Sequence, residues 1–256
     1  MPEVLYVYAI GRAGHALPDE LDVVALDVDG LTAFYAVVDA VEYSQTVIDA
    51  RSKDVEWLGA IGYRHQSVMS ALMRGGTVIP LRAFTLFANQ SSLRNHLEKE
   101  REHFLRILDR IDGKQEWTLR IEFRPEQWNE ALVSRFDSLQ KLADDIKQAA
   151  EGKAYLLRKK LDDEKKRVSR DAEMQVVGEV EKAVMEKLKC DTVAESRLQR
   201  GGAFPQINVL INRDEEARLQ ELSEELTRRY EPEGVTLALT GPWPPYSFAG
   251  TMNAER

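Results

Sequence analysis

Apolar and polar residues alternate over several short stretches of the chain, and a period of two predicts a strand with one buried face. In residues 235–240, Val235, Leu237 and Leu239 lie on one side, with threonine and alanine on the other. Residues 116–123 alternate in the same way, with tryptophan, leucine, isoleucine and phenylalanine on the buried side. Residues 4–10 are almost entirely apolar, which indicates a strand buried on both faces.

The N-terminal half mixes predicted strands with predicted helices. We expect strands over residues 4–10, 22–26, 31–38 and 77–81, and helices over residues 54–73 and from Ser91 or Ser92 to residue 111. Asp29-Gly30 stands between the second and third strands, and Asp-Gly between apolar runs is a strong hairpin signal. In the first helix, Leu58, Ile61 and His65 recur at steps of three and four residues along the apolar stripe.

The second half has the predicted order strand, long helical segment, strand, strand, helix, strand. Strands are expected at residues 116–123, 192–199, 203–211 and 235–240, with helices from Arg124-Pro125 through Ile146 and after an Asn212 cap. This βαββαβ order is that of a ferredoxin-like domain. We therefore expect an α+β protein of two domains. These are an N-terminal α+β domain (1–113) and a C-terminal ferredoxin-like domain with a long helical insertion (114–241), followed by a tail (242–256).

The long helical segment has a charged middle. Residues 158–173 hold only Leu161 and Val168 as large apolar side chains, whereas residues 174–188 regain an apolar stripe. One helix over residues 153–189 would exceed what a small sheet can cover. Either the charged part projects, or the segment folds as a helical hairpin with a break near Gly152; we expect a projecting arm. Such an arm is either a partner-binding element or a solvated spacer.

A proline-rich aromatic stretch follows the strand at residues 235–240. We expect Gly241-Pro242 to end that strand, because proline cannot donate a hydrogen bond to a sheet. Three prolines in four residues favour an extended path, which carries Trp243, Tyr246 and Phe248. These aromatic side chains either seal the core of their own domain or form an exposed anchor for a partner, since aromatic clusters often carry binding energy.

Composition narrows the class of partner. The 256-residue chain has a formal net charge of −8 and no isolated basic run, which argues against nucleic acid or an anionic membrane as the main partner. Cys190 is the single cysteine, so a reducing compartment fits. No signal peptide is visible, and no stretch reaches the ~18 apolar residues of a membrane span. We expect a soluble, cytosolic protein.

The sequence offers little catalytic chemistry. Its four histidines and one cysteine are scattered, and no Walker, dinucleotide-binding or Gly-x-Ser-x-Gly motif occurs. The sequence names neither a nucleophile nor an orienting carboxylate for His65, so we expect this side chain to be hydrogen-bonded in the core. Arg82 follows a buried strand, and a structural salt bridge is expected, with partner binding as the alternative. We predict a protein that is not an enzyme and binds no cofactor or metal.

One stretch resembles the C-terminal signature of the GvpF/GvpL family of gas vesicle proteins: Leu239-Thr240-Gly241-Pro242-Trp243-Pro244-Pro245-Tyr246-Ser247-Phe248. Residues 5–10 and 78–82 are weaker matches, and the resemblance covers essentially the whole chain in order. Many family members carry Phe-Gly-Thr after the arginine, where this chain has Ala83-Phe84-Thr85. The candidate partner-binding residues are Trp243, Tyr246, Phe248, Arg82 and Phe84.

The resemblance implies a minor structural and assembly protein of gas vesicles. Its partners would be the small, very hydrophobic shell protein and other vesicle proteins, and its role would be to prevent aggregation and support nucleation. Two other functions compete with this one. A ferredoxin-like regulatory module would bind a small ligand, although no glycine-rich ligand loop is evident. A coiled-coil scaffold would use residues 153–189, which lack sustained heptads.

Overall fold

The computed structural model describes residues 2–17, 21–195 and 204–250, and the chain divides into two compact units. Unit 1 consists of residues 1–116 and 243–256, and unit 2 of residues 117–242. The chain therefore leaves unit 1 after residue 116 and returns to it at residue 243. The aromatic tail belongs to the same unit as the N-terminal strand.

Unit 1 is built on a five-stranded sheet. Its strands are β1 (Glu3–Arg12), β2 (Val24–Val28), β3 (Leu31–Asp39), β4 (Val78–Pro80) and β5 (Leu86–Phe87). The order is β2-β3-β1-β4 with β5 also on β1, and these pairings are antiparallel. Asp29 and Gly30 adopt φ angles of 45° and 87° between β2 and β3. These positive values are those that a tight hairpin turn requires, so the predicted hairpin is present.

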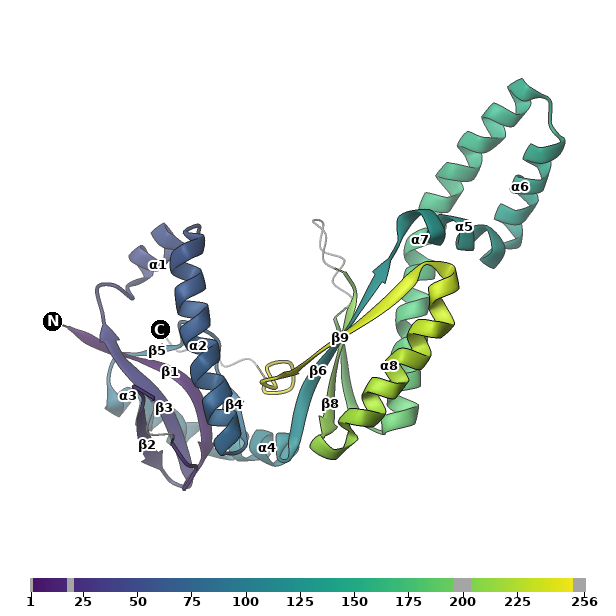
Figure 1. Cartoon of the computed structure of the whole chain (residues 1–256). Coiled ribbons are helices and arrows are strands. Elements are labelled where there is room, and N and C mark those ends of the chain that lie inside the picture. The colour runs from purple at the N-terminus through teal and green to yellow at the C-terminus, as the bar shows by residue number, and fades with distance from the viewer. Residues whose placement is uncertain (1, 18–20, 196–203, 251–256) are drawn as a thin grey trace. The chain divides into compact units, whose positions relative to one another are not determined.

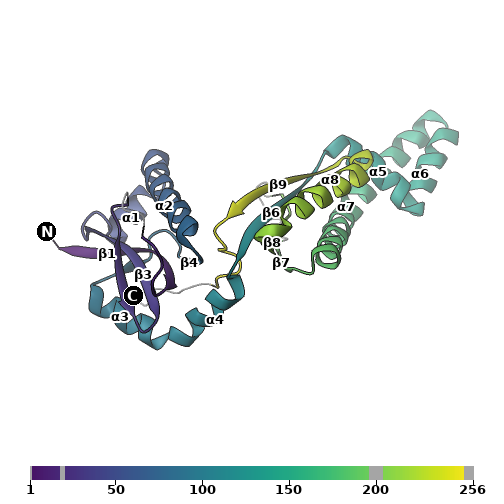
Figure 2. The ribbon, with the colours of Figure 1, turned by 60° about the horizontal axis from the view of Figure 1, so that its bottom comes forward.

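Helices cover both faces of this sheet (Figures 1 and 2). They are α1 (Gln45–Arg51), α2 (Val55–Gly75), α3 (Gln90–Lys99) and α4 (Arg101–Ile111). On one face, Tyr6 and Phe34 share a core with Met69 of α2. The side chain of Tyr35 points to the opposite face, where its hydroxyl accepts a hydrogen bond from Gln90 of α3 at 2.7 Å. The sheet therefore has a separate apolar layer on each side.

Helix α2 has well-defined ends. The Asp54 side chain accepts a hydrogen bond from the backbone N–H of Trp57 at 3.0 Å, which caps the first turn. At the other end, Nε2 of His15 lies 2.9 Å from the carbonyl oxygen of Leu72. A Cβ atom at Gly75 would lie 2.7 Å from the carbonyl oxygen of Ala16, so only glycine fits where the loop crosses the helix end.

The predicted helix beginning at Ser91 or Ser92 is wrong in its start and in its continuity. Asn89 is the cap: its side chain accepts from the N–H of Ser92, and Ser92 Oγ accepts from the N–H of Asn89. Because Ser92 completes this capping box from the third helical position, the helix starts earlier. At Glu100, with φ −100° and ψ 11°, α3 ends and α4 begins. The run of charged residues there contains no apolar position that would mark the break.

Unit 2 contains a four-stranded sheet in the order β7-β8-β6-β9. The strands are β6 (Lys114–Phe123), β7 (Asp191–Glu195), β8 (Gln206–Asn212) and β9 (Val235–Trp243). Two long helices, α7 (Glu151–Leu188) and α8 (Glu216–Tyr230), lie against one face (Figure 1). The alternating Trp117, Leu119 and Ile121 pack on their apolar residues. The ends of two predicted strands, at residues 196–199 and 203, lie outside the described residues.

The helix predicted from Pro125 to Ile146 is two helices, α5 (Pro125–Arg135) and α6 (Asp137–Gln148). Phe136 between them is extended, with φ −124° and ψ 116°, and its side chain packs against the core of unit 2. Helix α7 is continuous and packs beside α6, and the two connect through Ala149-Ala150. They form a helical hairpin that extends past the sheet of unit 2 (Figure 1), so a hairpin and a projecting arm both occur.

Two predictions about the ends of elements in unit 2 are also wrong, one at the start of α8 and one at the end of β9. Asn212 does not cap a helix through its side chain: it donates to the Glu215 carboxylate at 3.2 Å, and a short 3-10 turn, η1 (Arg213–Glu215), precedes α8. Strand β9 does not end at Gly241-Pro242 but reaches Trp243. An edge strand can accommodate proline, because one side of its backbone needs no sheet partner.

Candidate partner-binding site

Aromatic side chains gather on the α2 side of the unit 1 sheet. The cluster, here called the aromatic cluster, consists of Tyr6, Tyr8, Tyr43, Trp57, His65, Phe84 and Tyr246. The rings of Trp57 and Phe84 are stacked at 5.6 Å between centroids, and Tyr6 meets Phe84 edge-on at 6.3 Å. These offset and edge arrangements are the favourable ones for aromatic pairs.

His65 is the polar centre of this cluster. It is buried, and each of its ring nitrogens lies 3.0 Å from a tyrosine hydroxyl: Nδ1 from Tyr6 and Nε2 from Tyr246. A neutral imidazole has one N–H donor and one acceptor nitrogen, so one hydroxyl donates to the ring while the other accepts from it. The expectation of a hydrogen-bonded core histidine is confirmed.

Burial keeps the members of this hydrogen-bonded chain neutral. Desolvation lowers the pKa of His65, and it raises the pKa of Tyr246 to about 12. Desolvation also raises the pKa of Tyr6. Because Tyr6, His65 and Tyr246 are all neutral at neutral pH, the hydrogen bonds between them serve as a structural connection between their segments.

The tail is fixed to unit 1 by a second polar contact. The buried carboxylate of Glu116 accepts hydrogen bonds from the backbone N–H of Ser247 at 2.9 Å and from its hydroxyl at 2.8 Å. Phe248 is buried, with the guanidinium of Arg110 5.6 Å from its ring centre. The tail does not follow the predicted extended path but turns, since the N–H of Phe248 and of Ala249 both donate to the carbonyl of Pro245.

Phe84 has an unusual backbone conformation. Its φ is +64°, in the left-handed region that side chains other than glycine seldom adopt. The neighbouring turn is closed by Thr85, whose N–H and hydroxyl donate to the carbonyl of Arg82 at 3.2 and 2.7 Å. Non-glycine residues keep such a conformation only where their surroundings hold it. Here the contacts of the Phe84 ring with Trp57, Tyr6 and Tyr43 hold it.

The five candidate residues fall in different environments. Phe248 is only 2% exposed and belongs to the core, whereas Trp243 is 42% and Tyr246 37% exposed. Phe84 is half-buried. Arg82 is exposed, and the expected salt bridge is wrong: its side chain forms no ion pair with any residue that the structure describes. Of the five, Tyr246 and Phe84 come together in the aromatic cluster.

Sequence reasoning missed Trp57, Tyr6 and Tyr43 as members of the cluster. Trp57 precedes His65 by two helical turns, and this spacing would have placed both on one face of α2. Tyr6 lies on a strand that reads as buried on both faces, so nothing in its surroundings indicates which face it joins.

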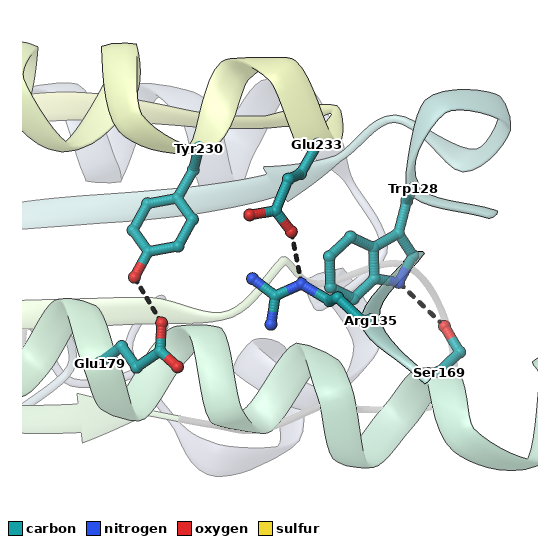
Figure 3. Close-up of polar contacts among 6 residues, drawn as sticks. All are labelled: Trp128, Arg135, Ser169, Glu179, Tyr230 and Glu233. Atoms are coloured by element: carbon teal, nitrogen blue, oxygen red, sulfur yellow. Dashed lines mark hydrogen bonds and ion pairs between the residues drawn. The ribbon is translucent and has the colours of Figure 1, made fainter. Parts of the chain in front are cut away.

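Unit 2 has its own polar group, where α5 and α7 meet the end of α8 and the turn that follows it (Figure 3). The indole N–H of Trp128 donates to Ser169 Oγ at 3.0 Å, and Tyr230 donates to Glu179 at 2.6 Å. Arg135 forms an ion pair with Glu233 and lies over the Trp128 ring. The Glu233 carboxylate raises the pKa of Arg135, and burial together with Glu179 raises the pKa of Tyr230 to about 12. The group ties α5 and α7 to the turn before β9.

The described part of the chain gives no support for a metal centre. No three histidine, cysteine, aspartate or glutamate side chains come together among residues 2–17, 21–195 and 204–250. Within the same ranges, every helix is too short or too polar to cross a bilayer.

Comparisons with known proteins agree on one family. The sequence profile of the gas vesicle synthesis protein GvpL/GvpF family matches residues 4–250. The chain is 30% identical over 237 residues to gas vesicle protein L of a Streptomyces species, covering 88% of this chain and 82% of that protein. It is 26% identical over 241 residues to gas vesicle protein L1 of Halobacterium salinarum, covering 90% and 82%.

Solved structures show the same fold. The crystal structure of the gas vesicle protein GvpF from Anabaena superposes with a TM-score of 0.69 at 15% identity, covering 98% of this chain and 100% of that one. GvpF from Microcystis aeruginosa gives a TM-score of 0.62 at 15% identity, with 96% and 99% covered. The mixed arrangement of helices and sheets is therefore shared with these structures.

Proposed function

The chain belongs to the GvpL/GvpF family of gas vesicle synthesis proteins, and from this premise we propose that it binds the small hydrophobic shell protein of gas vesicles. In this proposal, it keeps that protein from aggregating, delivers it to the growing vesicle together with other vesicle proteins, and carries out no chemical reaction. It would act in the cytoplasm and on the vesicle.

The observation that carries the proposal is the aromatic cluster of unit 1. Trp57, Phe84 and Tyr246 are all partly exposed while their neighbours Tyr6 and His65 are buried and hydrogen-bonded. Partly exposed aromatic rings on a fixed base are typical of the anchors that dominate protein interfaces. A net charge of −8 would help a complex with a hydrophobic subunit to stay in solution.

Co-expression with the shell protein tests the proposal. The amount of soluble shell protein and the vesicle yield are measured with wild type, with Trp57→Ala, with Trp243→Ala and without the protein. Tyr63→Ala is the matched control, because Tyr63 is 78% exposed on α2 and takes no part in the cluster. We expect about a tenfold loss of soluble shell protein for Trp57→Ala and no loss for the control. Circular dichroism verifies that each variant folds.

An unchanged amount of soluble shell protein in the absence of this chain would refute the proposal. If Trp57→Ala does not fold, the amount of soluble shell protein with Trp243→Ala becomes the test, because the Trp243 side chain is exposed at the end of β9.

We also propose that residues 114–241, which include nearly all of unit 2, form a ferredoxin-like domain. The support is its chain order β6-α7-β7-β8-α8-β9 with α5 and α6 inserted before α7, its strand order β7-β8-β6-β9 and its helices on one face. In this scheme, residues 1–113 form the first domain, and residues 242–256 are a tail whose Tyr246 and Phe248 contact that domain.

One observation favours the second candidate function, binding of a small ligand. A cavity of about 600 Å³ lies in unit 1 between α3 and the edge formed by Val4, Leu86 and Phe87. Ser92, Asn95 and Lys99 supply polar groups along one side, and this volume is typical of ligand sites. Thermal-shift screening with metabolites tests it: a stabilising ligand whose effect is lost in Lys99→Ala would support this function, and no shift would reject it.

A further inference from the structure

The far end of the α6–α7 hairpin carries apolar side chains that take no part in the packing of unit 2. Tyr155 and Leu156 of α7 are 67% and 65% exposed. Their neighbour Ala154 is buried in the hairpin, and Leu161 packs on the unit 2 core one to two turns later. The helix therefore already has an inward-facing stripe, and Tyr155 and Leu156 lie outside it.

Cations surround these two side chains. Lys153, Arg158, Lys159 and Lys160 stand between Gly152 and Leu161, and no acidic residue interrupts this stretch. In the described part of the chain, the side chains of Lys153, Arg158 and Lys159 form no ion pair or hydrogen bond. Lys160 interacts electrostatically with Glu164. A protein with a net charge of −8 thus concentrates four positive charges around one small apolar surface.

The acidic side chains that flank this surface, Glu151 of α7 included, form no ion pair with Lys153, Arg158 or Lys159 among the described residues. On α6, Asp144 pairs with Lys147 at 2.9 Å. On α7, Glu164 pairs with Arg167. Asp162 and Asp163 follow one turn after Arg158 and Lys159, yet no ion pair joins them. A spacer needs only a solvated, balanced surface, whereas an apolar centre with unpaired cations is suited to a partner of opposite charge.

We propose that the hairpin tip, defined as Lys153, Tyr155, Leu156, Arg158 and Lys159, binds an acidic amphipathic helix of another gas vesicle protein. Tyr155 and Leu156 would meet the apolar face of that helix, and the lysines and arginine would pair with aspartates and glutamates flanking it. The patch covers the part of α7 that faces away from buried Ala154 and extends for about two turns, a length that a single helix can match. The proposal rests on the proposed function, since it places a second vesicle partner away from the aromatic cluster.

Site-specific cross-linking in vesicle-forming cells tests the proposal. The full chain, as the only copy in the cell, carries the photo-cross-linking residue p-benzoylphenylalanine at position 155. The matched control carries it at position 185, since Met185 is also an exposed residue of α7 at 48%. We expect position 155 to cross-link to an Asp/Glu-rich helical segment of another vesicle protein. The double variant Arg158→Glu, Lys159→Glu should lower the yield of this cross-linked product about tenfold. The variant Arg170→Glu, about three turns further along α7, should leave it unchanged.

Reversal of the acidic residues on the cross-linked segment to lysine should restore binding to the charge-reversed tip. The proposal is overturned by a segment without acidic residues, by a yield no higher than at position 185, or by insensitivity to the double variant. The proposal is also overturned if the wild-type protein sediments with lipid vesicles that contain phosphatidylglycerol while the double variant does not. If removal of the chain leaves the amount of soluble shell protein unchanged, the proposed function fails. If removal lowers that amount but the tip variants do not change cross-linking, only this inference fails.

Discussion

The hydroxyl of Tyr246 lies 3.0 Å from Nε2 of His65, although 181 positions separate the two residues along the chain. The contact joins the tail to helix α2 and, through Nδ1 of His65 and the hydroxyl of Tyr6, to strand β1. Three segments far apart in sequence therefore share one buried histidine. The tail that follows unit 2 is an integral part of unit 1 and holds the exposed edge of the aromatic cluster in place.

Replacing Tyr246 by phenylalanine removes one hydrogen bond and leaves the ring. Because Nε2 of His65 then loses its partner in a buried position, we expect unit 1 to lose about 1–3 kcal/mol of stability. Hydrogen exchange of the α2 amides measures this loss in the relevant unit. Tyr63→Phe is the control, since the Tyr63 side chain is exposed. Equal protection in the two variants would show that the contact contributes nothing.

Acidification should weaken unit 1. Burial lowers the pKa of His65 below its usual value of 6.5, so the folded state favours the neutral ring. This contribution is complete above pH 6.5 and is lost as the pH falls through the lower pKa of the folded state. His15 acts in the same direction, because desolvation lowers its pKa as well. Urea unfolding at pH 7.5 and 5.5 should show a smaller acid-induced loss in His65→Gln than in wild type; an identical loss would contradict the assignment.

Local patterns predicted much of the fold because their signals lie within a few residues. The alternation in β6 and the Asp-Gly turn between β2 and β3 need no information from elsewhere. The one-face stripe of α2 likewise placed His65 in the core before any partner was known. Such elements form from the chain's own propensities and then pack together.

The breaks and the site depend on contacts distant in sequence. Phe136 interrupts an apolar stripe that continues on both sides, since its extended backbone directs the ring to the core. The return of the tail to unit 1 rests on Glu116 with Ser247 and on His65 with Tyr246, neither of which has a periodic signature. The sequence showed the aromatic side chains of the tail, but it did not show which of them would be buried.

The two buried tryptophans of unit 2 provide a matched pair. Trp128 donates its indole N–H to Ser169, whereas the indole N–H of Trp117 finds no acceptor among the residues that the structure describes. Replacement by phenylalanine removes a similar volume at each site. We expect Trp128→Phe to cost about 1–2 kcal/mol more than Trp117→Phe in equilibrium urea unfolding, because only the former loses a satisfied hydrogen bond. A larger loss for Trp117→Phe would indicate that its N–H is paired.

Phe84 offers a test of the balance between backbone strain and ring packing. Its φ of +64° suits glycine, yet its ring stacks on Trp57. Phe84→Gly and Phe84→Ala both delete the ring, but alanine still pays the cost of a left-handed conformation. We therefore expect the glycine variant to be the more stable by about 1 kcal/mol, the reverse of the usual order of these two residues. Hydrogen exchange of α2 and β1 compares them. A more stable alanine variant would show that the turn relaxes to negative φ once the ring is gone, and that the stacking alone imposes the conformation.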